Sequence, residues 1–205
     1  MKKTSKFLLA AVLAAGCVVS AAEAEKKADA SKAAEVSLIC NGDFSLLPLS
    51  TKRHWGKTKG SQWLEGWIGV ADLDRNTLDD KIFVSAPYSM RINSIDPKKG
   101  ADVRYWSLKT VKPNTRYRIS CMIKTENIEG VGGVCVNFVD TANRWFPEKN
   151  IKGTNDWKLY SFDYTTKEGT NQGKLPCTLG LRIVAATGTA WFDDVKVVEL
   201  APEQK

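Results

Sequence analysis

Short runs of β-favouring residues, separated by turn-forming residues, make up most of the chain after residue 35. In the run Tyr117–Lys124, apolar and polar side chains alternate, which places Tyr117, Ile119, Cys121 and Ile123 on one face. A period of two indicates a strand with one buried side. No helical period is sustained beyond the first residues, so the pattern favours an all-β fold.

About ten such runs occur, and Gly, Pro or Asn residues stand between them. Strands at this spacing within one domain predict two antiparallel sheets packed as a sandwich. The predicted strands are Ser37–Cys40, Trp67–Val70, Lys81–Ser85, Ser89–Ile92, Val103–Leu108, Arg116–Lys124, Val134–Val139, Lys158–Tyr164, Thr178–Ala185 and Ala190–Glu199.

Residues 1–24 have the pattern of a signal peptide. Three lysines precede the apolar run Phe7–Val19, and Ala22-Glu23-Ala24 fits the small-x-small motif before a cleavage site. The apolar run is shorter than the roughly 20 residues that a membrane-spanning helix needs. Leu13–Cys17 also resembles a bacterial lipobox, in which Cys17 would carry a lipid anchor, although cleavage after Ala24 is favoured. Both routes predict an exported protein that is extracellular, periplasmic or attached to the envelope.

The remainder divides into a flexible linker at 25–35, one domain at 36–200 and a short tail at 201–205. The chain carries a formal charge of +7, and removal of residues 1–24 lowers it to +5 because three lysines and one glutamate are lost. These charges are spread out and accompany no nucleic-acid-binding motif. They therefore favour a solvated exterior, with at most a weak preference for anionic surfaces or polymers.

Four cysteines remain after Cys17, and an even number in an exported domain permits two disulfides. Cys121 and Cys135 flank a predicted hairpin around Ile128-Glu129-Gly130, so one pairing joins Cys121 to Cys135 and Cys40 to Cys177. The alternative is that all four are small buried apolar residues.

Four motifs follow one another along the domain. They are Asn41–Phe44, Val111–Ser120, Asn155–Lys158 followed by Tyr160–Phe162, and Gly188–Val195, with Gly66-Trp67 after the first. In this order they resemble the motifs of carbohydrate-binding modules of families four, nine and twenty-two, which have the galactose-binding-like jelly-roll fold. The likeness extends over nearly the whole domain and identifies the fold better than the ligand.

The resemblance implies a structural calcium ion between the opening motif and the closing strand. Asp193, the first residue of Asp193-Asp194-Val195, would supply a carboxylate oxygen, and Asp43 could supply another. The chain departs from the pattern at Ser45, where such modules often have Glu. The alternative is that one Asp of the pair faces water and the other bonds to nearby backbone.

Catalytic candidates are few. His54 is the single histidine, so a His-dependent triad would rest on it alone. A glycosidase needs two carboxyl groups across the scissile bond, and the acidic stretch Asp72–Asp80 reads as a polar loop with no marked pair. A non-catalytic protein is therefore expected.

Carbohydrate binding has better candidates, because sugar rings pack on aromatic side chains and polar residues bond their hydroxyl groups. The resemblance assigns Trp67, Trp157 and Trp191 to the core and places glycan on the concave face of a sheet. It leaves Trp55, Trp63, Trp106 and Trp145 freer, and Trp145 follows Arg144 in a predicted loop or strand end. The predicted ligand-binding residues are Trp145, Trp106, Arg104, Arg144, Asn137 and Tyr105.

We therefore expect an exported, non-catalytic module that binds a poly- or oligosaccharide by aromatic stacking and polar side chains. One alternative is a structural or protein–protein interaction module of the envelope with the same fold. A small secreted hydrolase is the other alternative.

Overall fold

The computed structural model describes residues 36–46, 66–68, 75–105, 108–141, 143–172 and 176–202. At positions 143, 145, 148 and 149 it describes the backbone only. Val36–Lys205 form one compact unit. The predicted signal peptide with Cys17, the linker, His54, Asp72, Asp74 and the tryptophans Trp55, Trp63 and Trp106 lie outside the described residues.

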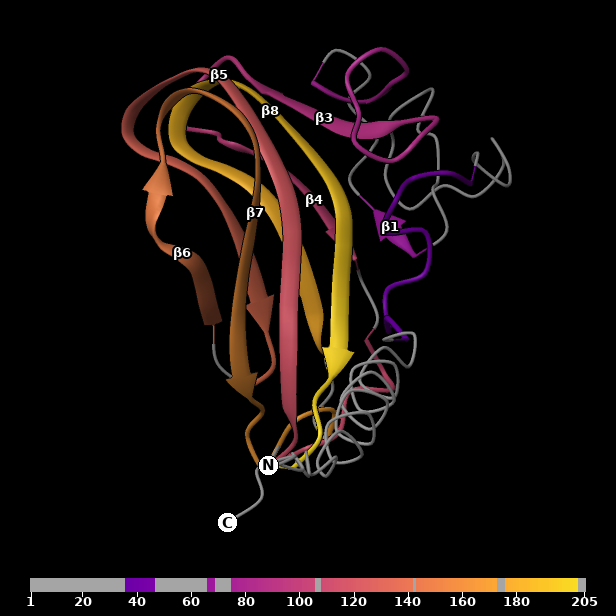
Figure 1. Ribbon diagram of the computed structural model, residues 1–205. Helices are drawn as coiled ribbons and strands as arrows, with labels where there is room; N and C mark the ends of the chain where they lie inside the picture. Colours follow the sequence, from indigo (N-terminus) through magenta and orange to yellow (C-terminus); the bar gives the residue numbers. More distant parts are fainter. Residues whose placement is uncertain are drawn as a thin grey trace, which may run out of the picture. The chain divides into compact units, whose positions relative to one another are not determined.

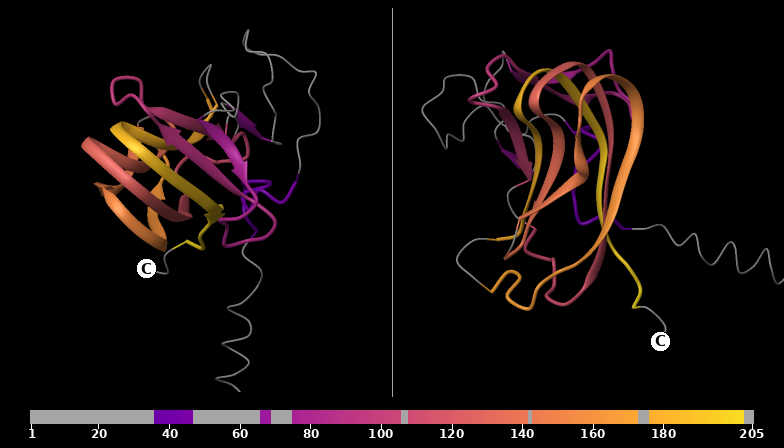
Figure 2. Two further views of the ribbon diagram at one scale, coloured as in Figure 1. Left: turned by 90° about the horizontal axis from the view of Figure 1, so that it is seen from above. Right: turned by 90° about the vertical axis from the view of Figure 1, so that its left-hand side faces the viewer.

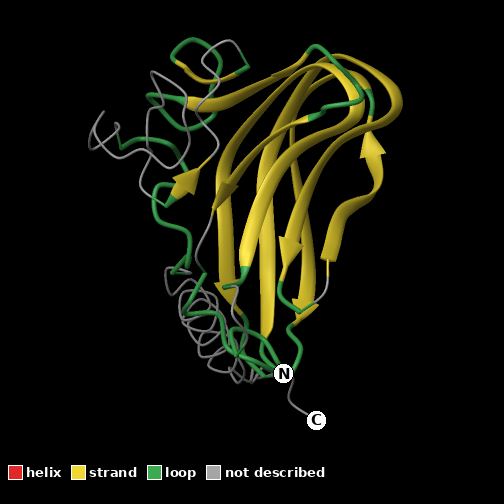
Figure 3. Ribbon diagram, turned by 180° about the vertical axis from the view of Figure 1, so that it is seen from behind, coloured by secondary structure: helices red, strands yellow, loops and turns green. Residues whose placement is uncertain are grey.

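The described part of the chain contains strands and loops and no helix (Figure 3). No helix there is long and apolar enough to cross a membrane. The strands are β1 (Trp67–Ile68), β2 (Asn76–Asp79), β3 (Ser89–Ser94), β4 (Ala101–Tyr105), β5 (Arg116–Val139), β6 (Asn143–Ile151), β7 (Gly153–Thr165) and β8 (Thr178–Glu199).

Two strands, β5 and β8, are long enough to run through both layers of a sandwich. Both bend over at the top of Figure 1, so that the second half of β5 and the first half of β8 lie behind their other halves. The first half of β5 and the second half of β8 lie in one layer, which has the order β2-β3-β8-β5-β7 and is called the first layer below. Their other halves form the second layer, β1-β4-β8-β5-β6. All pairs are antiparallel, which confirms the predicted all-β sandwich.

The bends depend on residues that accept a left-handed backbone. The β5–β8 ladder shifts register between Glu126 and Glu129 and again between Gly130 and Gly133, at the fold-over seen in both views of Figure 2. Gly188 has φ of 114°, and a Cβ atom there would lie 2.4 Å from the carbonyl oxygen of Asn127. Only glycine fits this close approach, so the sequence itself bends the ladder here.

The core lies between the two layers. Alternate residues of each strand point into it, as the period of two predicts, and those of β5 include Tyr117, Ile119, Val136 and Phe138, which are fully buried. Beside β6 and β7 the core is aromatic. The ring centroids of Phe146 and Phe162 lie 4.4 Å apart there.

Several strand predictions are corrected. The two predicted strands Arg116–Lys124 and Val134–Val139 are one strand, β5, and the last two predicted strands are likewise one strand, β8. Lys81–Ser85 is a loop, whereas Asn76–Asp79, predicted as part of a polar loop, is strand β2. The segment from Asn143, predicted as a loop or strand end, belongs to β6.

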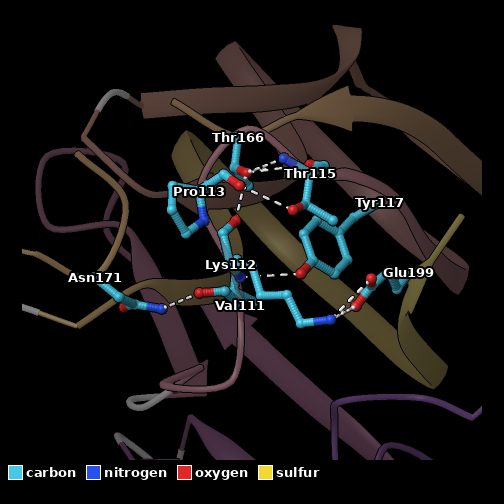
Figure 4. Close-up of polar contacts among 8 residues, drawn as sticks. All are labelled: Val111, Lys112, Pro113, Thr115, Tyr117, Thr166, Asn171 and Glu199. Atoms are coloured by element: carbon cyan, nitrogen blue, oxygen red, sulfur yellow. Dashed lines mark hydrogen bonds and ion pairs between the residues drawn. The ribbon is translucent and has the colours of Figure 1, made fainter. Parts of the chain in front are cut away.

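The middle motif, Val111–Tyr117, forms a hydrogen-bonded turn that leads into β5 (Figure 4). The backbone N–H of Lys112 donates to the Tyr117 hydroxyl at 3.0 Å, and the Lys112 ammonium contacts Glu199 at 2.9 Å. The hydroxyl of Thr166 accepts from the N–H of Thr115 and donates to the carbonyl of Lys112. Because these polar groups bond one another, the motif stabilises the start of β5.

The predicted disulfides are wrong, since Cys40, Cys121, Cys135 and Cys177 are all free thiols. The expected hairpin around Gly130 does not exist, because β5 continues through it. Cys121 points into the core from the first layer, whereas Cys135 lies on the outer face of the second layer, opposite Arg182. The Cys40 sulfur instead lies 3.0 Å from the Tyr105 hydroxyl.

Candidate functional site

A row of residues crosses the outer face of the second layer. The neighbours Val103, Leu181 and Val136 point into the core, so the residues that alternate with them face outward. The ladders pair Arg104 with Gly180, Gly180 with Asn137, and Asn137 with Trp145. Ile68 of β1 precedes Arg104 in the same line. The outer row, from one edge strand to the other, is Ile68, Arg104, Gly180, Asn137 and Trp145.

Arg104 is the exposed cation of the outer row. Its side chain is 44% exposed, and its Nε donates to Asp102 Oδ2 at 2.5 Å. Asp102 stands two residues earlier on β4 and therefore on the same face. This ion pair orients the guanidinium, and the bond through Nε leaves the two terminal nitrogens for another acceptor.

Asn137 has a supporting position in the outer row. It is 5% exposed, and its Nδ2 donates to the backbone carbonyl of Arg144 at 3.1 Å. This bond fixes the backbone of β6 directly before position 145. The polar interruption seen in the sequence of β5 therefore holds the neighbouring edge strand in place.

Gly180 lies buried at the centre of the outer row. A Cβ atom there would have the Cδ of Arg182 at 3.4 Å and the Cγ of Arg104 at 3.8 Å among its three nearest neighbours. The aliphatic stems of two arginines therefore pack beside this glycine. Arg182 is half-buried and lies directly opposite Asp102 in the β4–β8 ladder.

The structure separates the other predicted binding residues from the outer row. Tyr105 is 7% exposed on the inner face of β4, where its ring packs edge-on against Trp67. The guanidinium carbon of Arg144 lies 5.3 Å from the ring centroid of Tyr164, on β7 of the first layer. Tyr105 is thus a core residue, and Arg144 makes a cation–π contact instead of facing the row. Trp106 lies outside the described residues.

The three tryptophans expected in the core differ from one another. Trp67 is fully buried in it. Trp191 is 4% exposed, but it lies on the outer side of the first layer, opposite Arg91 and Lys124, and its Nε1 donates to Asp79 at 2.8 Å. Trp157 is half-buried on β7.

Asp193, the expected calcium ligand, is fully buried and holds a loop by hydrogen bonds. Its Oδ2 accepts from the backbone N–H groups of Val84 and Ser85, both at 2.8 Å, and its Oδ1 accepts from Asp194 N–H at 2.7 Å. The Ser85 hydroxyl donates to Asp194. Burial raises the pKa of Asp193, and its three N–H donors act in the opposite direction.

Three N–H donors therefore occupy most of the acceptor positions of the Asp193 carboxylate. Its role as a calcium ligand stays a prediction. Asp43 Oδ1 accepts from the backbone and hydroxyl of Ser45, the residue at which the motif departs from the calcium-binding pattern. Within the described ranges, no three Asp, Glu, His or Cys side chains converge as a metal site.

The opening and closing motifs do meet, as a seam of backbone hydrogen bonds. The N–H of Val195 donates to the Gly42 carbonyl at 2.9 Å, and that of Leu38 donates to the Val197 carbonyl at 2.7 Å. The motif pair that suggested calcium therefore joins the two ends of the domain through its main chain.

Sequence reasoning missed Gly180, Arg182 and Asp102 as part of this surface. The pattern that could have identified them is the alternation of inward and outward residues in β8 and β4, where Leu179, Leu181 and Val103 point inward. Applied to Thr178–Ala185, the period of two would have put Gly180 and Arg182 on the outer face together.

The sequence matches no protein-family model and no curated protein. Among solved structures, the chain is similar to a family 61 carbohydrate-binding module in complex with β-1,4-galactotriose, with 11% identity, a TM-score of 0.51, and coverage of 80% of this chain and 99% of that one. It is also similar to a family 4 module, with 16% identity and a TM-score of 0.48, over 79% of this chain and 99% of that one. A family 16 module matches with 16% identity and a TM-score of 0.43, over 60% of this chain and 85% of that one. The chain thus has the jelly-roll fold of carbohydrate-binding modules.

Proposed function

We propose that this protein is an exported, non-catalytic module that binds a poly- or oligosaccharide on the outer face of its second layer. The observation that carries the proposal is the outer row, in which the ladders bring Arg104, Asn137 and position 145 into one line from three different strands. An aromatic residue and a cation in line across a sheet fit an elongated ligand lying across the strands.

Each residue of the row has a chemical role in this proposal. Position 145 is paired with Asn137 in the ladder, and we assign sugar stacking to the tryptophan that the sequence has there. The terminal nitrogens of Arg104, oriented by Asp102, would donate to sugar oxygens. Asn137 acts as a positioning residue, because its amide group holds the backbone of β6.

The similar solved structures support this proposal through the fold, and the residues of the outer row supply the rest. At 11% identity to the family 61 module, the galactotriose of that complex does not name the sugar for this chain. Binding instead of catalysis is proposed because Asp102, a carboxylate beside the row, is already paired with Arg104.

Affinity gel electrophoresis in a panel of soluble polysaccharides tests the proposal. We expect at least one polysaccharide to retard the protein, and Trp145→Ala and Arg104→Ala to abolish most of that retardation. Trp157→Ala is the matched control, since it removes a tryptophan from β7 in the other layer and should leave retardation unchanged. Lack of retardation by every polysaccharide, or equal loss in the control, would contradict the proposal.

Export is proposed from residues 1–24 alone. Fractionation of the native cell, followed by N-terminal sequencing of the mature protein, tests it. A mature chain that begins after Ala24 indicates signal-peptide cleavage, whereas a lipid-modified Cys17 indicates anchoring to the envelope. Recovery of the full chain with Met1 in the cytoplasmic fraction would overturn the proposal.

A further inference from the structure

Arg104 and Asp102 form an ion pair that uses only part of each group. Arg104 donates through Nε to Asp102 Oδ2 at 2.5 Å. Among the residues that the structure describes, no other group donates to this carboxylate, so Oδ1 keeps its acceptor positions and the terminal nitrogens of Arg104 keep their donors. The two side chains are 44% and 32% exposed, so a ligand can reach the pair from solvent.

A second Arg–Asp pair, on the outer face of the first layer, shows the closed form of the same contact. Arg118 reaches both oxygens of Asp163, with Nε at 2.8 Å from Oδ1 and Nη2 at 3.0 Å from Oδ2. Arg116 adds a bond to Oδ2 at 2.9 Å. The Asp163 carboxylate thus has both oxygens occupied, whereas the Asp102 carboxylate has one oxygen to offer.

The position of Asp102 is fixed by its neighbours. Val103 points into the core, so Asp102 and Arg104 lie together on the outer face of β4. The backbone carbonyl of Asp102 accepts from Nδ2 of the buried Asn76, the first residue of β2, at 3.1 Å. The pair is therefore held in place before a ligand arrives, which reduces the entropy lost on binding.

This arrangement matches two neighbouring hydroxyl groups. A hydroxyl group both donates and accepts, so one can donate to Asp102 Oδ1 while its neighbour accepts from a terminal nitrogen of Arg104. Hydrogen bonds to charged groups are about twice as strong as those between neutral groups. An anionic substituent would face the Asp102 carboxylate and be repelled, so the pair favours a diol.

We infer that Asp102 and Arg104 together bind a vicinal diol of the sugar chain, and that Asp102 contacts the ligand directly. This inference rests on the proposed carbohydrate-binding function. It adds a ligand class, namely polysaccharides whose rings keep hydroxyl groups on adjacent carbons. Chains linked 1,4 keep such a pair at C2 and C3, whereas the internal rings of 1,3-linked chains do not.

Polymers of one sugar that differ in linkage test the ligand class. Affinity electrophoresis compares β-1,4-galactan with β-1,3-galactan, and β-1,4-xylan with β-1,3-xylan, beside the wider panel of polysaccharides. We expect each polymer that retards the protein to carry vicinal diols along its chain. A 1,4-linked polymer that binds should do so about tenfold or more tighter than its 1,3-linked counterpart.

Removal of one hydroxyl group separates direct contact by Asp102 from a positioning role. The probes for calorimetry are tetrasaccharides of the polymer that binds, intact or deoxygenated at C2 or at C3. The native protein should bind one deoxygenated form about tenfold more weakly than the intact one. Asp102→Asn should bind the intact form about tenfold more weakly and distinguish the two forms much less. If Asp102→Asn distinguishes them as well as the native protein does, Asp102 only positions Arg104 and the inference is overturned.

Asp163→Asn is the matched control, because it breaks the closed Arg–Asp pair of the first layer and should leave binding unchanged. Circular dichroism and thermal melting confirm the fold of both variants. Equal weakening by the control, or equal binding of the two linkages, overturns the inference while the proposed function stands. If no polysaccharide binds, the proposed function fails as well.

Discussion

The carboxylate of Asp193 accepts a hydrogen bond from the backbone N–H of Val84 at 2.8 Å, across 109 residues of sequence. This contact and its neighbour at Ser85 fasten an apolar loop, in which Phe83 and Val84 are 37% and 43% exposed, to the closing strand. The loop has no strand pairing of its own between β2 and β3. Its conformation therefore depends on a buried anion that satisfies successive main-chain donors.

Asp193→Asn should lower the free energy of unfolding by about 1–3 kcal/mol. An amide has one acceptor oxygen, so its NH₂ group would face at least one of the three N–H donors. Urea denaturation followed by fluorescence measures the loss.

Asp194→Asn is the matched control for this substitution. Asp194 has φ of 49°, which asparagine adopts readily, and an amide oxygen can still accept from the Ser85 hydroxyl. The control should change stability by less than about 0.5 kcal/mol. Equal loss in the two variants would contradict the role given to Asp193.

Removal of divalent cations should leave the domain unchanged. The Asp193 carboxylate is bonded to three N–H groups, so no structural calcium ion is needed to balance its charge there. Thermal melting in EDTA and in millimolar CaCl₂ should give the same midpoint. A rise in the midpoint with calcium that disappears in Asp193→Asn would contradict this prediction and indicate that calcium binds at Asp193.

The sequence predicted the sandwich but misplaced its bends. Gly130 and the residues around it indicate a change of direction, and glycine serves equally in a hairpin turn and in a bend of a continuous strand. The difference lies in long-range pairing, because β8 bends at the same height and stays paired with β5 on both sides. That pairing cannot be read from the local pattern.

The candidate residues are brought together only in part for a similar reason. Arg104 was selected for its face of the predicted strand Val103–Leu108 and Asn137 as a polar residue within a strand, and both lie in the outer row. Arg144 and Tyr105 were selected by residue type, but the face of a side chain depends on strand register, which local sequence does not specify. Gly180 carries no side-chain chemistry, so its residue type gave no reason to select it.

Native cysteines in the described domain should show no disulfide and one reactive thiol. Burial raises the pKa of Cys121 well above its ordinary value, that of Cys135 to about 11 and that of Cys177 to about 12. Because the thiolate is the reactive form, these three should resist alkylation at pH 8, whereas the exposed Cys40 should react.

Peptide mapping by mass spectrometry after brief iodoacetamide treatment checks this pattern. Alkylation in guanidinium chloride is the control and should label all four cysteines. A peptide pair linked by a disulfide, or rapid labelling of native Cys135, would contradict the packing described for β5.

Acid should weaken the anchoring of the β2–β3 loop through Asp79. Burial acts to raise the pKa of this residue, but hydrogen bonds from Trp191 Nε1 and the N–H groups of Lys81 and Ile82 outweigh it, so the pKa lies below 3.8. The folded state thus holds the proton less tightly than the unfolded state. Asp79 therefore contributes full stability well above pH 3.8, and this contribution falls as the pH drops through 3.8 toward the lower folded-state value.

Urea denaturation at pH 6 and pH 3 measures this contribution. Asp79→Asn should be less stable than the native protein at pH 6 and should lose less stability on acidification, since it cannot take up the proton. The exposed neighbour Asp80 supplies the control, because Asp80→Asn should keep the native pH dependence. If Asp79→Asn and the native protein lose the same stability between the two pH values, Asp79 is not the group whose protonation weakens the loop in acid.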